Sequence, residues 1–387
     1  MLTDLQNWIE SEFEGHVALL KRFAAIPAPS HDEGRRVEFL LRYFKDLCVR
    51  AYEDAAKNVL VPMGCDGADD ITLVSAHTDV VFPDTVELPI IERDGKLIGP
   101  GVGDDSANAA AILSIIKFIK QNGLTPGRPL LFALNSCEEG LGNLKGIKQI
   151  MRDFSGRIAR CVSFDCHFES GIITRAVGSV RWRVVCKTRG GHSYGDFGSA
   201  NAIHRMAQLI SRLYEQRLPV EESADTDSPA AVCTFNVGTI SGGTSVNTIA
   251  SSCEMLYECR SDDRDALDSM SKSFYDILGA AQSPDAEFSC ELIGKRPCGS
   301  RSGDAGARSL QLLCAESYRA VMGAEPKLSS GSTDANVPIS LGIPALTFGL
   351  YSGGGMHTRE EWLDIASLKK GLEIGLLTVL RLCFADS

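Results

Sequence analysis

The chain is organised around one stretch, Gly99-Pro-Gly-Val-Gly-Asp-Asp-Ser-Ala-Asn-Ala-Ala-Ala-Ile-Leu113. A glycine-rich turn delivers Asp104 and Asp105 to the start of an apolar, alanine-rich helix. The stretch does not fit a nucleotide-binding loop, because Asp104 stands where the third glycine of Gly-x-Gly-x-x-Gly is needed and carboxylates repel phosphate. Two interpretations stay open here: the acidic pair caps the helix, or it binds a cation.

Three apolar segments have the composition of buried strands, and each is followed by residues that can bind metal. The segments are 71–76, 128–135 and 157–164, and the residues that follow them are His77, the pair Glu138 and Glu139, and Asp165. Helical patterns separate these strands. The alternation predicts an α/β fold, a mixed sheet flanked by helices, with a site at the carboxyl edge of the strands.

Each strand-end motif also has an ordinary explanation. His77 and Asp79 project from one face of a strand, as a metal ligand and its supporting carboxylate would. The same residues also fit a surface turn that follows a strand. Two adjacent glutamates are costly to desolvate if they are buried without a cation. Pairs of glutamates are common on protein surfaces, however, so Glu138 and Glu139 also fit an ordinary surface position. No single motif decides between these interpretations.

The pattern changes after about residue 177. Strand, helix, strand, strand, helix and strand follow in that order, with an acidic loop at 221–227. This order predicts an inserted α+β domain of ferredoxin-like type at 178–295. The first domain then comprises residues 1–177 and 296–387.

Composition limits the classes of partner. The 387 residues carry a net charge of −11, which argues against nucleic acid or an anionic membrane as the main partner. The 13 cysteines form no Cys-x-x-Cys pair and indicate buried thiols in a reducing compartment. The N-terminus has no signal-peptide pattern and no apolar run is long enough to span a membrane, so we expect a cytoplasmic protein.

Five groups combine into one candidate metal centre: His77, Asp104, Glu139, Asp165 and His357. Two histidines and three carboxylates suit a pair of Zn²⁺ ions that share one carboxylate, with Co²⁺ or Mn²⁺ as alternatives. With these residues in view, the sequence resembles the zinc-dependent exopeptidase and deacylase family of peptidase T, carboxypeptidase G, succinyl-diaminopimelate desuccinylase and the aminoacylases. The matching motifs span nearly the whole chain: His77-Thr-Asp79, Gly101-Val-Gly-Asp104-Asp105, Glu138-Glu139-Gly140, Phe164-Asp165, Gly191-His192-Ser193, Ser241-Gly-Gly-Thr-Ser-Val-Asn247 and Gly355-Met-His357-Thr.

The resemblance implies a role for each residue of the centre. Asp104 would bridge two metals, with Glu139 and His357 on one ion and His77 and Asp165 on the other. Asp79 would steady the His77 imidazole. Glu138 would be the general base that takes a proton from the attacking water and returns it to the leaving amine. A cis peptide bond between Asp104 and Asp105 is implied as well.

For the inserted domain the resemblance implies a lid and a dimerisation surface. His192 would hold the oxyanion, acting across a homodimer, while Asn247 and Arg260 would contact substrate. A helix cap at His192 and a solvated strand end at Arg260 remain the ordinary alternatives. Cys137, Cys166 and Ser106 depart from common family patterns, which leaves the substrate preference open.

The function expected from these residues is exopeptidase hydrolysis of short peptides, as in di- and tripeptidases or aminopeptidases. An N-acyl amino acid deacylase would use the same residues on a different acyl group. A non-catalytic peptide-binding protein on this fold is the alternative of another class, and the intact Glu138 argues against it.

Overall fold

The computed structural model describes residues 2–216, 218, 232–301 and 303–384, so the acidic loop expected at 221–227 lies outside the described residues. The chain forms two compact units. Unit 1 comprises Met1–Ala176 and Ser300–Ser387, and unit 2 comprises Val177–Gly299. The second unit is therefore inserted into the first, with ends one and four residues from the expected 178 and 295.

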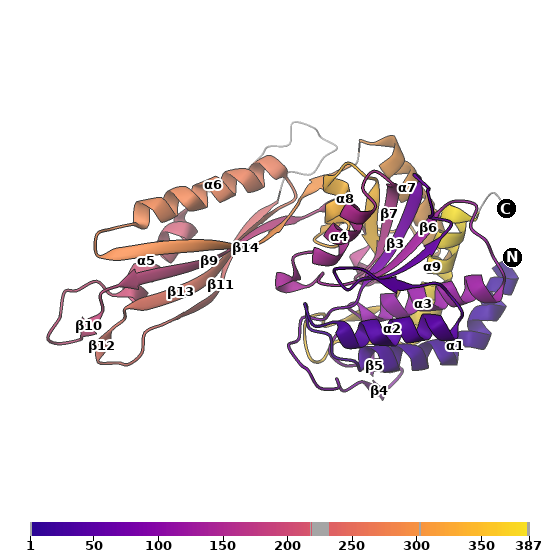
Figure 1. The fold of residues 1–387 in the computed structure, drawn as a ribbon, viewed down its shortest axis with the longest axis horizontal. Coiled ribbons are helices and arrows are strands. Elements are labelled where there is room, and N and C mark those ends of the chain that lie inside the picture. Colours follow the sequence, from indigo (N-terminus) through magenta and orange to yellow (C-terminus); the bar gives the residue numbers. More distant parts are fainter. Residues whose placement is uncertain (1, 217, 219–231, 302, 385–387) are drawn as a thin grey trace. The chain divides into compact units, whose positions relative to one another are not determined.

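Unit 1 is built on a mixed sheet of nine strands (Figure 1). Its hydrogen-bonded order is β1-β2-β6-β3-β7-β17-β8-β15, and β16 pairs with β8. Strands β6, β3, β7 and β17 run parallel, so their carboxyl ends share one edge of the sheet. The strands are β1 (Tyr52–Glu53), β2 (Val59–Met63), β3 (Ile71–His77), β6 (Leu130–Asn135), β7 (Ile158–Phe164), β8 (Ile172–Ala176), β15 (Gly299–Ser300), β16 (Leu328–Gly331) and β17 (Ala345–Phe348).

Both faces of this sheet are buried, and alternate residues serve different cores. Val74 and Phe132 pack with helices α1, α2, α3, α7 and α9, whereas Leu73 and Leu131 pack with α4 and α8. This period of two explains why the central strands read as continuous apolar runs. The helices are α1 (Leu2–Ala24), α2 (Gly34–Asp46), α3 (Ser106–Gln121), α4 (Lys145–Asp153), α7 (Ala305–Met322), α8 (Asn336–Ser340) and α9 (Ser367–Cys383).

A second, small antiparallel sheet of unit 1 joins segments far apart in the sequence. Its order is β18-β19-β5-β4. These strands are β4 (Ile91–Arg93), β5 (Lys96–Ile98), β18 (Gly353–Gly354) and β19 (Trp362–Asp364). The pairing of β19 with β5 brings the His357 loop beside the turn that begins at Gly99.

Unit 2 has the strand order β14-β9-β13-β11, all antiparallel, which is the ferredoxin-like arrangement. Trp182, Tyr257 and Phe274 stack in its core between the sheet and its helices. A two-stranded ribbon, β10 with β12, lies beyond this sheet. The elements are β9 (Gly178–Thr188), β10 (Gly191–His192), α5 (Ala202–Glu215), β11 (Cys233–Gly242), β12 (Thr248–Ile249), β13 (Ser252–Ser261), α6 (Arg264–Ala281) and β14 (Ala286–Arg296).

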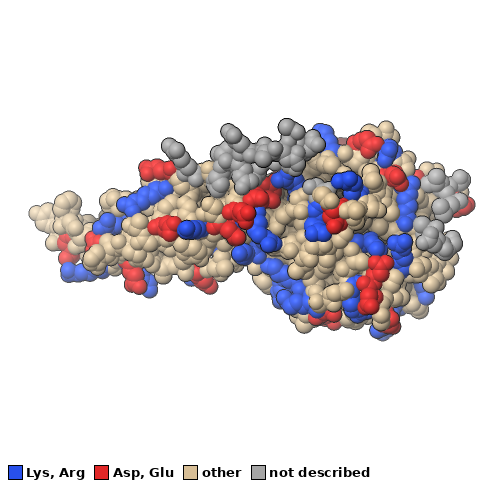
Figure 2. All heavy atoms as spheres, turned by 90° about the horizontal axis from the view of Figure 1, so that it is seen from above, with Lys and Arg blue, Asp and Glu red and all other residues tan. Residues whose placement is uncertain are grey.

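Acidic and basic side chains are interspersed on the face drawn in Figure 2. Within the described ranges, every helix is too short or too polar to cross a membrane. The 13 cysteines are all free thiols, and most are buried.

Candidate metal centre and catalytic residues

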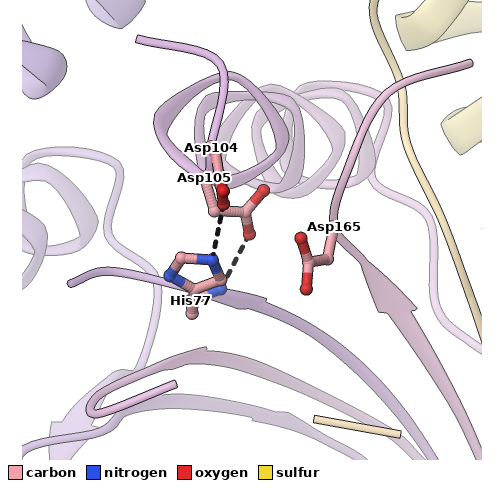
Figure 3. Close-up of side chains that lie close together, drawn as sticks. All are labelled: His77, Asp104, Asp105 and Asp165. Carbon is pink, nitrogen blue, oxygen red and sulfur yellow. Dashed lines mark hydrogen bonds and ion pairs between the residues drawn. The ribbon is translucent and has the colours of Figure 1, made fainter. Parts of the chain in front are cut away.

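One half of the centre lies where β3 and β7 end and α3 begins (Figure 3). The His77 Nε2 atom is 3.0 Å from Oδ1 of Asp104, and the His77 backbone N–H donates to Oδ2 of Asp105 at 2.8 Å. Asp165 presents its carboxylate to the same space from just beyond β7. All four side chains are buried, and their ligand atoms lie within 4.8 Å of one another.

The other half adds Glu139 and His357 to the same aspartate. His357 Nε2 is 3.1 Å from Oδ2 of Asp104 and 3.1 Å from Oε1 of Glu139. Each oxygen of Asp104 therefore faces a different histidine, as a bridging carboxylate requires. The expected cis peptide bond between Asp104 and Asp105 is confirmed.

Acidic groups outnumber basic ones in this buried space. Burial raises the pKa of Glu139 to about 8 and that of Asp165 to about 7, and the charge of Asp104 adds to both shifts. Burial also acts to raise the pKa of Asp104, but hydrogen bonds with His357 and His77 outweigh it and hold that pKa below its usual range. Hydrogen bonds to Asp104 and Glu139 raise the pKa of His357 to about 11.

This donor set fits divalent metal ions. Imidazole nitrogen and carboxylate oxygen are ligands that Zn²⁺ accepts, and cationic charge offsets the cost of burying several carboxylates together. His77, Asp104, Asp105 and Asp165 form one group of suitable spacing, and Asp104, Glu139 and His357 form another. Asp104 belongs to both groups, so the residues fit a pair of ions.

Glu138 and Asp79 lie beside these groups. Ligand atoms of Glu138 lie within 4.8 Å of those of His77 and Glu139, and Glu138 is 5 % exposed. The Asp79 carboxylate accepts the backbone N–H groups of Glu138 and Glu139, each at 2.9 Å. Asp79 contacts His77 mainly through its backbone oxygen, 3.0 Å from Nδ1, with its carboxylate at 3.4 Å. Its carboxylate thus holds the glutamate turn as well as facing the imidazole.

One protein family matches most of the sequence. The sequence profile described as Peptidase family M20/M25/M40 matches residues 73–381. The chain belongs to peptidase family M20/M25/M40. Proteins of this family include metal-dependent hydrolases, and the buried cluster described above could bind a metal as in the dinuclear metallopeptidases.

Individual relatives are distant and differ in their named activities. An uncharacterised Bacillus subtilis protein, YqjE, is 25% identical over 369 residues, covering 90% of this chain and 93% of its own. Acetylornithine deacetylase of Myxococcus xanthus is 26% identical over 323 residues, covering 80% of each chain. The structure is similar to that of a Staphylococcus aureus tripeptidase, with a TM-score of 0.74 and 21% sequence identity. The match covers 94% of this chain and 96% of the tripeptidase. The dipeptidase Dug1p of Saccharomyces cerevisiae gives TM-score 0.75 at 17% identity, with 98% of each chain covered.

Within this M20 site, sequence reasoning missed Glu361. Its buried carboxylate accepts the backbone N–H groups of Gly101, Gly103 and Asp104 at 3.0, 2.8 and 2.7 Å. Burial, together with the charge of Asp104, raises the pKa of Glu361 to about 7. Glu361 thereby fixes the turn that carries Asp104. The signal available was an acidic pair, Glu360-Glu361, three and four residues beyond His357.

Other supporting groups also escaped the sequence analysis. Asp105 was expected only as part of the acidic pair that caps the helix or binds a cation, but its carboxylate also accepts the His77 backbone N–H and accepts from the Asn108 amide at 2.6 Å. The Arg36 guanidinium is fully buried and donates to the backbone oxygen of Thr78 at 3.0 Å, between His77 and Asp79. A buried cation beneath several carboxylates favours their charged forms.

The expected lid residues lie in unit 2 at two separate places. His192 on β10 and Asn247 are neighbours, because the N–H of Ser193 donates to the Asn247 backbone oxygen at 3.0 Å. Two backbone N–H groups, from Tyr194 and Gly195, point at Nδ1 of His192, each at 3.3 Å. The ring proton therefore belongs on Nε2, which is left as a donor.

Arg260 lies at the other end of the unit 2 sheet. It pairs with Ser179 near the start of β9, whereas Ser252 of the same strand pairs with Lys187 near the end of β9. Eight residue steps separate Arg260 from Ser252, or roughly 26 Å at about 3.3 Å per residue. Arg260 also forms an ion pair with Glu258 at 2.9 Å. Within one chain, unit 2 does not bring Arg260 together with His192 and Asn247.

Proposed function

We propose that this M20 protein is a dinuclear zinc exopeptidase that hydrolyses an amide bond of short peptides. The observation that carries the proposal is the buried cluster in which Asp104 directs one oxygen toward His77 and the other toward His357. A purely structural core would gain nothing from concentrating this many acids. Two divalent ions bound there would polarise the scissile carbonyl and lower the pKa of water.

The proposed ligands follow the two groups of side chains. His77 and Asp165 would hold one ion, Glu139 and His357 would hold the other, and Asp104 would be shared by both. Asp79 and Glu361 orient these ligands through backbone hydrogen bonds. Orienting groups of this kind raise metal affinity because the ligands do not have to be ordered on binding.

Glu138 is the proposed general base. It lies three residues beyond the end of β6, and its ligand atoms lie within 4.8 Å of those of His77 and Glu139, which places it beside the candidate metal groups. Glu138 takes the proton from water as the carbonyl is attacked and gives it to the leaving nitrogen. The amine then leaves neutral, which an amide requires.

For substrate contacts we propose a homodimer. A substrate of dipeptide size cannot touch both Arg260 and His192 of one unit 2, because Arg260 lies roughly 26 Å along β13 from Ser252, the end of the strand that follows the β10–β12 ribbon of His192. Arg260 of one chain and His192 with Asn247 of a second chain can meet one substrate. His192 then donates from Nε2 to the developing oxyanion.

The surface around His192 supports a second copy as its partner. Tyr194 and Phe197 are each 90 % exposed, and Val246 beside Asn247 is also fully exposed. Large apolar side chains clustered on one ribbon are typical of protein interfaces. Among the described residues, strand β11 forms one edge of the unit 2 sheet, and an edge strand is a place for pairing between copies.

A cytoplasmic location also remains part of the proposal. All 13 cysteines are free thiols. Burial raises the pKa of several of them, Cys161 and Cys314 among them, which keeps these thiols protonated and unreactive. Free thiols in this number suit a reducing compartment.

A second candidate function is hydrolysis of N-acyl amino acids. It is favoured by the curated relatives, among which are acetylornithine deacetylases and succinyl-diaminopimelate desuccinylases. The proposed chemistry is the same, since both substrates present an amide carbonyl. A peptide-binding protein without catalysis is the third candidate, and the intact Glu138 beside the cluster argues against it.

A substrate panel separates these three candidates. Zinc-loaded protein is assayed against dipeptides, tripeptides, N-acetyl and N-succinyl amino acids, with Glu138→Gln as the matched control. We expect turnover of free peptides that the Glu138→Gln protein lacks. Turnover of the acyl amino acids alone would replace the peptidase proposal with the deacylase, and no turnover with retained peptide binding would favour the third candidate.

A further inference from the structure

A cavity of about 400 Å³ opens in unit 1 at the amino-terminal edge of the sheet. Its lining comes from the residues that precede β6 and β17, the start of β7, the first half of α7 and the last turn of α9. Arg160 on this lining and Asp165 of the metal centre are five residues apart on one strand, roughly 16 Å. The cavity and the candidate metal centre therefore lie at opposite ends of the same strands.

Three arginines line this cavity: Arg128, Arg160 and Arg381. Among the described residues, which end at residue 384, none that lines the cavity carries a carboxylate. An adjoining hollow of about 580 Å³ shares Arg381 with it and adds Arg308 and one acid, Glu316. In a chain of net charge −11, this is a local concentration of positive charge.

Two of these guanidinium groups are held in place by buried hydroxyls. Arg160 donates to Oγ1 of Thr72 at 3.0 Å and to Asp70 at 2.8 Å. Arg381 donates to Oγ of Ser317 at 3.0 Å. Fixed guanidinium groups lose little conformational entropy when they bind a ligand.

The positive charge on the lining is only partly neutralised by the protein itself. Among the described residues, Arg160 has a carboxylate partner, whereas Arg381 has a neutral hydroxyl and the Arg128 side chain has no hydrogen bond or ion pair. The remaining walls are apolar, with Leu310, Leu313 and Pro344. Unpaired guanidinium groups beside apolar walls suit a ligand that carries both an anionic group and an apolar body.

We propose that this cavity binds a small organic anion, a carboxylate or phosphate group attached to an apolar body. The anionic group would contact Arg128 and Arg381, and the apolar body would pack on Leu310 and Leu313. A volume of about 400 Å³ falls in the range of small-molecule sites. The site is distinct from the metal centre, so it does not depend on the proposed peptidase activity.

Calorimetric titration of the metal-loaded, full-length protein tests this proposal. The probes are phenyl phosphate, benzoate and, as the neutral analogue, benzyl alcohol. Arg128→Ala and Arg381→Ala each remove one cavity charge, and Arg152→Ala removes an exposed charge from α4 as the matched control. Binding at the metal centre is common to all four proteins, so it cancels in the comparison.

We expect at least one anion to bind the wild-type protein and the Arg152→Ala protein equally. Its dissociation constant should rise at least tenfold in each cavity variant, because each loses a charge-assisted hydrogen bond. The phosphate and benzoate titrations show which anionic group is preferred. Equal affinity of the Arg128→Ala and Arg152→Ala proteins for both anions, or equal binding of benzyl alcohol, would overturn the proposal. Arg128 is exposed, so its variant tests the site even if Arg381→Ala fails to fold.

Discussion

At the scale of single residues, the pair Glu138 and Glu139 shows how neighbouring identical side chains can differ in role. The carboxylate of Asp79 holds both backbone N–H groups. Among the described residues, Glu139 contacts His357 and belongs to a candidate metal group with Asp104, whereas Glu138 belongs to one with His77 and Glu139. One turn thus carries both the proposed ligand and the proposed base.

Replacing each glutamate separately tests this division of roles. Glu138→Gln should lower turnover by roughly 10²–10⁴-fold, since it removes proton transfer, and should leave metal content unchanged. Glu139→Gln should lower both turnover and metal content, since it removes a ligand. Metal analysis beside steady-state kinetics measures the two effects. Equal metal loss in the two variants would refute the assignment.

Glu361 holds the turn that carries Asp104, and replacing it tests whether this positioning matters for metal binding. Glu361→Gln keeps the size of the side chain but weakens its hydrogen bonds to Gly101, Gly103 and Asp104. We expect metal affinity to fall by about 10–100-fold, and excess metal should restore most of the turnover. Exposed Glu360→Gln is the control and should behave as wild type. Unchanged metal affinity in the Glu361→Gln protein would remove its positioning role.

At the scale of elements, a buried histidine joins α1 to α3. His16 is 3 % exposed, its Nδ1 lies 2.9 Å from Oγ of Ser114, and burial lowers its pKa from 6.5 to about 4. The unfolded chain therefore takes up a proton below pH 6.5 that the folded chain refuses until about pH 4. The contribution of His16 to the unfolding free energy is therefore fully present above pH 6.5 and is lost as the pH falls from 6.5 to about 4.

The effect of His16 is measurable as a difference between variants. Lowering the pH from 7 to 5 should reduce the unfolding free energy of the wild-type protein by about 2 kcal/mol through His16. The His16→Gln protein should not show this loss. Denaturant unfolding of metal-free protein at both pH values measures it, with exposed His204→Gln as the control. The same pH dependence in the wild-type and His16→Gln proteins would show that this histidine is protonated when folded.

The sequence predicted these elements well where local pattern determines them. Apolar runs followed by polar residues predicted β3, β6 and β7 and the groups at their ends, because buried parallel strands need such runs. Glu361 could not be found this way, since its partners lie 257–260 residues away and Glu360 looks identical in sequence. Arg36 was missed for the same reason: its burial depends on packing of distant segments.

At the scale of the whole molecule, the proposed dimer combines the candidate metal centre of one chain with His192 of another. Mixing two inactive variants, His192→Ala and Glu138→Gln, under subunit exchange tests it. In the proposed dimer, the His192→Ala chain supplies Glu138 and its partner supplies His192. Random exchange should then recover about a quarter of wild-type activity. No recovery despite demonstrated exchange would place His192 in its own chain's site or outside the chemistry.

The most direct test of the proposed metal centre is a zinc titration of metal-free protein that follows bound zinc and amide hydrolysis together. If His77, Asp104, Glu139, Asp165 and His357 are the ligands, as we propose, the protein should bind two zinc ions tightly per chain. Asp104→Ala should reduce the binding of both ions, because Asp104 bridges them, whereas Asp165→Ala should affect one. We predict that activity is absent without metal and complete at two equivalents. Full activity of the chelated protein, or an Asp104→Ala protein that still binds two ions tightly, would contradict this account.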